Sequence, residues 1–174
     1  MTETKTKLES GFTFYFRITD KKLQGGKNDY QDSVKKMAEF STVEDFWKIF
    51  QHIKKPESLK SGIEIQLFKN PIKPMWEDES NKDGGRLSIR IKKDYSSLVW
   101  EELVLDMLSG SFPKTVKEQL NGIVLSIRGG FNCIQIWFKN FKEPHISELE
   151  KCIKETLQIP EGIEIDTKPF FKNK

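Results

Sequence analysis

The chain has 174 residues, of which 36% are hydrophobic and 32% are charged, and its formal net charge is +3. This balance is typical of one soluble globular domain with a core of its own, and it excludes an intrinsically disordered chain. The mild positive charge is compatible with a polyanionic partner without requiring one, and no apolar run approaches the length that crosses a bilayer.

The first half of the chain predicts one strand, one loop and one helix. Residues 12–18 are rich in aromatic residues and lack helical periodicity, which predicts a strand. Residues 19–29 are polar and contain Gly25 and Gly26, which is typical of a loop. Apolar residues then recur at helical spacing over 43–53, and Ser41 with Glu44 predicts a capping box in front of that helix.

The second half alternates between predicted strands and helices. Strands are expected over 63–68, 86–91, 122–128, 133–138 and 163–165, and helices over 100–108 and 144–157. Pairs of strands separated by single helices favour an α+β fold, with an antiparallel or mixed sheet that carries its helices on one face. We expect residues 1–10 to form a flexible N-terminus and residues 11–174 to form a single domain.

Catalytic signatures are missing from the sequence. The two histidines, His52 and His145, stand outside any nucleophile or metal motif, and no phosphate-binding glycine loop occurs. The two cysteines, Cys133 and Cys152, lack the spacing of a metal or redox motif and are interpreted as reduced core thiols. We therefore expect a protein that is not an enzyme and that uses neither a metal nor a cofactor.

The most informative segment is residues 71–86, PIKPMWEDESNKDGGR. Pro74 restrains the chain just before Trp76, and Gly84 and Gly85 close the segment, so it is predicted to be a long loop. Composition alone leaves two readings of Trp76 open: a side chain that folds back into the core, or an exposed aromatic that binds a ligand.

Three motifs resemble the eukaryotic initiation factor 4E family of cap-binding proteins. They are the loop at 71–86, STVEDFW at 41–47, and NGIVLSIR at 121–128 followed by IQIW at 134–137. Their order and spacing match the family over residues 12 to about 165. The resemblance implies a curved antiparallel sheet of about eight strands, backed by three α-helices on its convex face, with the mRNA cap bound on the concave side.

The resemblance also implies a role for individual residues. Tyr30 and Trp76 resemble the two aromatic residues that sandwich the 7-methylguanosine base, and Glu77 the carboxylate that reads the guanine edge. Trp137 matches the residue that touches the methyl group. Arg128 matches an arginine that binds the cap phosphates, and Arg86, at the start of the strand after the Trp76 loop, is a second candidate by its position. Members of the family often carry further basic residues at the positions of Gly130 and Cys133 here, so we expect a weaker attraction for phosphate.

A second surface is implied on the helical face. Val43, Trp47 and Leu105 match the positions that bind a 4G-type scaffold or a 4E-binding protein, and Glu102 is expected to cap or pair with the bound peptide. Glu101 stands where a leucine is common, and the N-terminus lacks the His-Pro that often borders this groove, which leaves the choice of partner open. The family further implies a monomer without a membrane segment, found in the cytoplasm and also in the nucleus.

Three functional readings remain open at this level. The chain is a cap-binding initiation factor, a cap-binding repressor that does not recruit the scaffold, or an interaction module of the same fold that has lost cap affinity. Phe12, Tyr15 and Tyr30 stand where the main initiation factors carry tryptophan, and this combination resembles the class II branch, the 4E homologous proteins.

Overall fold

The computed structural model describes residues 4–19 and 30–171. Its strands are β1 (Lys7–Ile18), β2 (Val34–Thr42), β3 (Ile63–Lys69), β4 (Gly85–Ile91), β5 (Leu120–Ser126), β6 (Asn132–Phe138) and β7 (Ile165–Pro169). Its helices are α1 (Tyr30–Ser33), α2 (Val43–Phe50), α3 (Ser96–Ser109), α4 (Lys114–Gln119) and α5 (His145–Thr156), with 3₁₀ turns at Pro56–Ser58 and Lys93–Tyr95.

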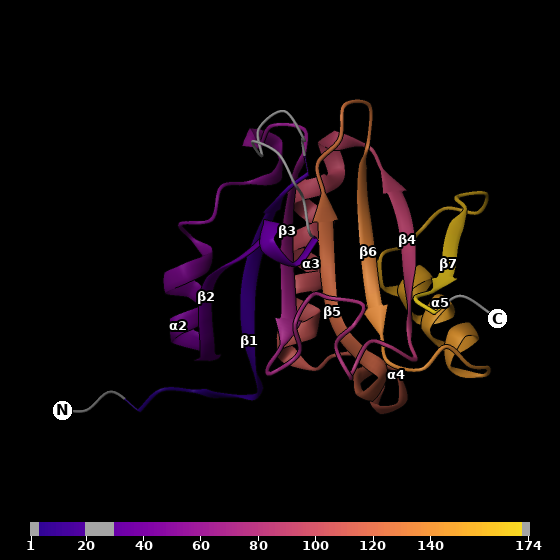
Figure 1. Ribbon diagram of the computed structural model, residues 1–174, viewed down its shortest axis with the longest axis horizontal. Coiled ribbons are helices and arrows are strands. Elements are labelled where there is room, and N and C mark those ends of the chain that lie inside the picture. The colour runs from indigo at the N-terminus through magenta and orange to yellow at the C-terminus, as the bar shows by residue number, and fades with distance from the viewer. Residues whose placement is uncertain (1–3, 20–29, 172–174) are drawn as a thin grey trace.

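The seven strands form one antiparallel sheet in the order β2-β1-β3-β5-β6-β4-β7. Figure 1 shows α3 running behind β3 and β5, whereas α1 and the loop between β3 and β4 lie in front of the sheet. The predicted α+β class with three main helices is confirmed; the part of the chain that the structure describes has seven strands, where about eight were expected.

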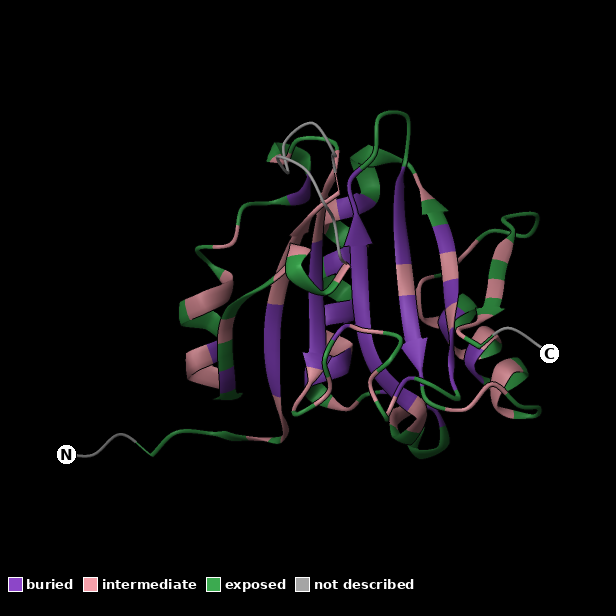
Figure 2. Cartoon of the chain, viewed as in Figure 1, coloured by how far each residue is buried: buried purple, intermediate pink, exposed green. Residues whose placement is uncertain are grey.

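The main core lies between the sheet and the helices. Alternate strand residues such as Phe14, Leu67 and Ile136 point into it and meet Trp100 and Leu103 of α3. Figure 2 shows that the buried positions concentrate in the central strands. Burial of this apolar surface is the main stabilising contribution to the fold.

The opposite side of the sheet, called the open face below, carries a smaller apolar cluster. Phe68, Val124 and Trp137 are its buried members, and Tyr15 and Phe170 pack against them. Side chains alternate between the two sides of a strand, so Arg17, Glu64 and Gln66 share this face with Tyr15 and Phe68. The open face is therefore a mixture of aromatic and polar groups, which suits the binding of a ligand more than the packing of a helix.

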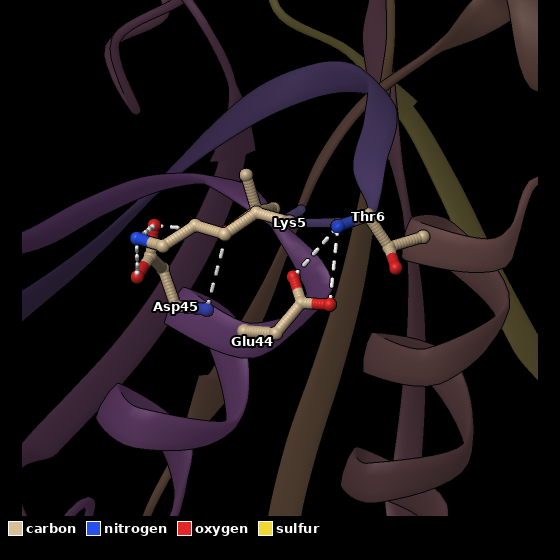
Figure 3. Close-up of polar contacts among 5 residues, drawn as sticks. Lys5, Thr6, Glu44 and Asp45 are labelled. Atoms are coloured by element: carbon tan, nitrogen blue, oxygen red, sulfur yellow. Dashed lines mark hydrogen bonds and ion pairs between the residues drawn. The ribbon is translucent and has the colours of Figure 1, made fainter. Parts of the chain in front are cut away.

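The N-terminal residues are held against the first turn of α2. Lys5 Nζ lies 2.6 Å from the Asp45 carboxylate, and the backbone N–H of Thr6 donates to the Glu44 carboxylate at 2.9 Å (Figure 3). The carbonyl of Thr6 accepts from the N–H of Val43 at 2.9 Å. As a result β1 begins at Lys7, earlier than the domain boundary expected at residue 11.

The cap of α2 differs from the predicted pair of Ser41 and Glu44. The N-cap is Thr42, whose Oγ1 accepts the N–H of Asp45 at 3.2 Å, and Thr42 donates its hydroxyl proton to the Asp45 carboxylate at 2.8 Å. The physical reason is that β2 extends through Ser41, so the helix starts one residue later than the sequence pattern indicated.

One strand was not predicted, and the bounds of others differ from those expected. The sequence pattern predicts no strand over Val34–Thr42, because this edge strand is mostly exposed and carries polar residues such as Lys35 and Lys36 instead of a clean apolar alternation. The last strand is Ile165–Pro169 instead of 163–165, because its partner is the edge of β4, with Ile165 opposite Ile89.

Candidate functional site

The loop between β3 and β4 is held from inside by a buried amide. Asn81 is fully buried, and its Nδ2 donates to the backbone carbonyls of Lys73 at 2.9 Å and Met75 at 2.8 Å. Its Oδ1 accepts from Asn121 Nδ2 at 2.9 Å, and Asn121 also donates to the carbonyl of Ser80 at 2.7 Å. The loop is thus tied to itself and to β5 through side-chain amides.

A second set of contacts closes the same loop around Asp78. The Asp78 carboxylate accepts the backbone N–H of Lys73 at 3.0 Å and that of Ser80 at 2.9 Å, and its carbonyl accepts from the N–H of Asn81 at 2.8 Å. Trp76 and Glu77 lie between these ties. They therefore project from a segment whose backbone is fixed on both sides.

Trp76 and Glu77 are exposed. Trp76 is 51% exposed, which decides against the reading in which it fills the core. An exposed tryptophan on a rigid loop presents a flat aromatic face to solvent, and the neighbouring Glu77 places a carboxylate beside it. This pair is suited to a flat ligand that has hydrogen-bond donors on its edge.

Tyr30 begins α1 and lies over the open face. The guanidinium of Arg17 lies 4.3 Å from the centroid of its ring. Burial first, and then the charges of Glu64 and Glu77, raise the pKa of Tyr30 to about 12 against the opposing effects of Arg17 and Gln66, so the phenol stays neutral at physiological pH. Tyr30 and Glu77, although far apart in the sequence, therefore lie within electrostatic range of each other.

Trp137 is buried on the open face. It is 4% exposed, packs edge-on against Phe68 with ring centroids 5.3 Å apart, and lies 4.4 Å from the ring of Phe170. Its Nε1 donates to Gln135 Oε1 at 3.1 Å. In this arrangement the Trp137 ring is packed between other side chains of the open face and presents little surface to a ligand.

Three arginines lie on or beside the open face around β4 and β6. Burial raises the pKa of the Cys133 thiol, while the charges of Arg128, Arg86 and Arg90 act in the opposite direction, so all three cations lie near this thiol. Arg86 lies opposite Trp137 on β4 and Arg128 follows β5. The two predicted phosphate ligands are thus brought to the same region.

Arg90 was missed by the sequence analysis. It pairs with Cys133 across β4 and β6, and its guanidinium lies 4.8 Å from the ring centroid of Phe131. The signal was available, because the strand alternation that places Arg86 on the open face also places Arg90 there. Members of the family that the sequence resembles often carry a basic residue at the position of Cys133. Arg90 supplies a positive charge beside this position.

On the helical face, the structure brings together only some of the residues predicted to bind a partner protein. Trp47 is 46% exposed and lies beside half-buried Val43 on α2. Leu105 is half-buried against the main core. Glu102 lines a hollow of about 760 Å³ formed by α3, β4 and the residues that follow α5, including Leu98 and Ile163. Glu102 therefore faces a different hollow from the surface around Trp47.

Comparisons with known proteins agree with this geometry. The family model for eukaryotic initiation factor 4E matches residues 7–174. The translation initiation factor NCBP of Oryza sativa is 36% identical over 141 residues, which is 80% of this chain and 61% of the relative, so the chain spans about three fifths of that protein.

Two solved structures have the same fold over almost the whole chain. One is C. elegans eIF4E-3 in complex with the 4E-binding protein Mextli and a cap analog, with a TM-score of 0.86, 25% identity and coverage of 95% of this chain and 93% of that one. The other is Ascaris suum eIF4E-3 with the m2,2,7G cap, with a TM-score of 0.86, 27% identity and coverage of 98% and 94%.

In the residues that the structure describes, no helix has both the length and the apolar character of a membrane span. The relatives are named as translation initiation factors, which agrees with the expectation of a non-enzymatic protein. From the match to the family model over residues 7–174, together with the shared fold, we conclude that the chain belongs to the eukaryotic initiation factor 4E family.

Proposed function

We propose that this chain binds the 7-methylguanosine cap of mRNA on the open face, with the base stacked between Tyr30 and Trp76 and with its edge read by Glu77. The observation that carries the proposal is the exposed pair Trp76 and Glu77 on a loop fixed by buried Asn81. Support also comes from the C. elegans and Ascaris suum structures, which hold a cap analog and the m2,2,7G cap.

The chemistry of the base matches these side chains. Methylation at N7 makes guanine a delocalised cation, which stacks well on electron-rich aromatic faces and gains cation–π attraction. Two N–H donors on the guanine edge suit the ionised carboxylate of Glu77. Adenine lacks this pair of donors and would leave Glu77 without a partner, so the carboxylate selects guanine as well as binding it.

Arg86, Arg90 and Arg128 form the phosphate half of the proposed site. Their charges all act on the Cys133 thiol, and Arg86 is half-buried with an Nε atom that has no hydrogen-bond partner. Arg90 compensates for the missing basic residues at Gly130 and Cys133. We therefore expect the affinity to increase from the methylated nucleoside to its triphosphate and to fall as the salt concentration rises.

Fluorescence titration tests the proposal directly. Because Trp76 is exposed at the site, m7GTP is expected to quench tryptophan emission at concentrations where unmethylated GTP has little effect. The variant Trp76→Phe is the control, since it keeps an aromatic face and removes the reporting indole. Equal quenching by GTP and m7GTP, or the same quenching in the control, would contradict the proposed stacking.

For the helical face, we propose that α2 binds a 4G-type scaffold or a 4E-binding protein through Val43 and Trp47, with Leu105 of α3 at the margin. Glu102 faces the neighbouring hollow and lies outside this surface. The exposure of Trp47 beside half-buried Val43 supports the proposal, because a grouped apolar patch suits the apolar side of an amphipathic helix. The C. elegans relative was solved with the 4E-binding protein Mextli.

We also propose that the chain belongs to the class II branch of the family, because Phe12, Tyr15 and Tyr30 stand where the main initiation factors carry tryptophan.

Replacing Trp47 with alanine is expected to abolish the capture of a helical peptide that carries the Tyr and Leu-hydrophobic motif, while m7GTP affinity stays within about 2-fold, because binding energy concentrates in a few buried aromatic anchors. A peptide pull-down and the m7GTP titration measure the two effects. Leu98→Ala, on the neighbouring hollow, is the control. Capture that survives Trp47→Ala, or is lost in Leu98→Ala alone, would place the partner surface elsewhere.

A further inference from the structure

Arg17 stands beside Tyr30 but had no role in the sequence analysis. It lies near the end of β1, opposite Glu64 of β3, and its side chain is on the open face. Its Nε donates to Ser33 Oγ at 2.8 Å, its NH1 group donates to the Glu64 carboxylate at 3.3 Å, and its Cζ lies 4.3 Å from the centroid of the Tyr30 ring. One side chain therefore joins β1, β3 and α1.

The guanidinium of Arg17 is held by groups that are themselves fixed. Glu64, whose side chain is 12% exposed, also accepts from Gln66 Nε2 at 3.3 Å and from Ser126 Oγ at 2.9 Å. Ser33 donates its hydroxyl proton to the carbonyl of Tyr30 at 2.7 Å. Arg17 is thus part of a hydrogen-bonded network that spans three strands and ends on both the backbone and the ring of Tyr30.

The direction of β3 indicates at which end of the open face Arg17 lies. Glu64 is near the start of β3, and the strand runs from there to Lys69, after which the chain enters the loop that carries Trp76. A strand advances about 3.3 Å per residue, so the Arg17–Glu64 pair lies more than 10 Å along the strand from the loop end. The backbone of Arg17 is therefore at the end of β3 that is remote from this loop.

Building on the proposed cap-binding function, we propose that Arg17 is a positioning residue for Tyr30. Its guanidinium packs on the face of the ring that points away from Trp76 and holds the ring in the orientation that receives the methylated base on its opposite face. Glu64 is the second part of this arrangement, because its negative charge compensates the guanidinium.

The compensation by Glu64 matters because the ligand is also a cation. Two positive charges on the two sides of one aromatic ring repel each other and compete for the same ring electrons. With Glu64 ionised beside Arg17, the ring is fixed by the guanidinium while the net charge behind it stays close to zero. The Arg17–Glu64 pair therefore affects both the orientation of Tyr30 and the preference for a methylated base.

A double-mutant cycle with Tyr30 tests the proposal. Arg17→Gln is expected to weaken m7GTP binding by about 5-fold in the wild-type background and by less than about 2-fold in Tyr30→Ala, because an effect transmitted through a ring disappears with the ring. Lys35→Gln removes the same charge from the adjacent strand β2 and is expected to leave the affinity within about 2-fold. Titration of all variants and their melting temperatures provide the readouts.

Glu64→Gln provides the second arm. It leaves Arg17 uncompensated, so it is expected to reduce the ratio of m7GTP to GTP affinity by about 3-fold or more, whereas an effect on the fold alone lowers both affinities together. Equal losses of affinity from Arg17→Gln in the wild-type and Tyr30→Ala backgrounds would overturn the positioning role of Arg17. An unchanged ratio of m7GTP to GTP affinity in Glu64→Gln would overturn the charge compensation by Glu64.

The ligand-free protein separates this inference from the proposed function. If Arg17 packs on Tyr30, Arg17→Gln shifts the NMR signals of the Tyr30 ring protons without any ligand, whereas Lys35→Gln leaves them in place. If Arg17→Gln shifts these ring signals but the wild-type protein does not bind m7GTP, the cap-binding proposal fails while the Arg17–Tyr30 contact stands. Unshifted ring signals would refute the contact itself.

Discussion

Replacing Glu77 with alanine is expected to lower the affinity for m7GTP by about 10- to 100-fold, because the two N–H donors of the guanine edge lose a charge-assisted partner in a site shielded by aromatic rings. The free energy of unfolding is expected to change by less than about 0.5 kcal/mol, since Glu77 is an exposed loop residue outside the hydrogen bonds that hold the loop. Fluorescence titration and urea denaturation measure the two quantities.

The same loop offers a matched control for Glu77. Glu79→Ala removes an equal charge two residues further on, where the carboxylate makes only an exposed ion pair with Lys82 at 2.6 Å. Exposed pairs contribute about 0–1 kcal/mol, so this variant is expected to keep both its stability and its cap affinity. A comparable loss of affinity in Glu79→Ala would mean that the loop attracts the ligand through its general charge and not through the edge contact of Glu77.

Glu77→Gln sharpens the test further. Glutamine keeps the shape of the side chain but replaces one acceptor oxygen with an N–H₂ group, which faces a donor on guanine. We expect it to bind m7GTP almost as poorly as the alanine variant. An affinity close to that of the wild type would show that Glu77 contributes packing instead of accepting two hydrogen bonds.

The sequence was sufficient for features that depend on local patterns. The helical spacing around Phe46 and the alternation over 86–91 gave α2 and β4 with small errors in their bounds. The loop motif around Trp76 carried the family resemblance, which supplied the sheet and the side on which a ligand would bind. Composition alone left the exposure of Trp76 open, because a tryptophan among prolines and glycines is compatible with both a core and a binding role.

Features that depend on contacts between residues far apart in the sequence could not be predicted from local sequence patterns. The coverage of Trp137 by Phe170 requires β7 to pair with β4 and return the C-terminal residues to the open face. The anchoring of Arg17 likewise depends on Glu64 and Ser33, which come from other elements. Arg90 is a different case. The sequence shows that it alternates in step with Arg86, and only the strand pairing in the structure shows that it lies opposite Cys133.

Asn81 is the clearest residue of this kind, because its chemistry is ordinary and its place in the structure is not. In the sequence it is one polar residue among many in a loop. In the structure it is fully buried and partners the carbonyls of Lys73 and Met75 and the amide of Asn121. We expect the exposed positions of Trp76 and Glu77 to depend on this buried residue, since its hydrogen bonds join the two sides of the loop.

Replacing Asn81 with alanine is therefore expected to reduce both stability and binding. The change removes three hydrogen bonds, to the carbonyls of Lys73 and Met75 and from the amide of Asn121. At a net contribution of about 0.5–1.5 kcal/mol each, the free energy of unfolding should fall by about 2–4 kcal/mol. The m7GTP affinity should fall by about 10-fold or more, because Trp76 and Glu77 must then be ordered at the expense of binding energy. Urea denaturation and fluorescence titration measure both effects.

Asn140→Ala is the matched control, since Asn140 makes its hydrogen bond to Gln119 at 2.9 Å from a half-buried position outside the loop. It is expected to cost about 1 kcal/mol and to leave m7GTP binding unchanged. Where Glu77→Ala affects binding alone and Asn140→Ala stability alone, Asn81→Ala affects both, because one buried amide supports the fold of the loop and the orientation of its exposed side chains. An Asn81→Ala protein that is destabilised yet binds m7GTP like the wild type would mean that Trp76 and Glu77 keep their orientation without the amide, and that the Asp78 contacts and the flanking strands are enough to order the loop.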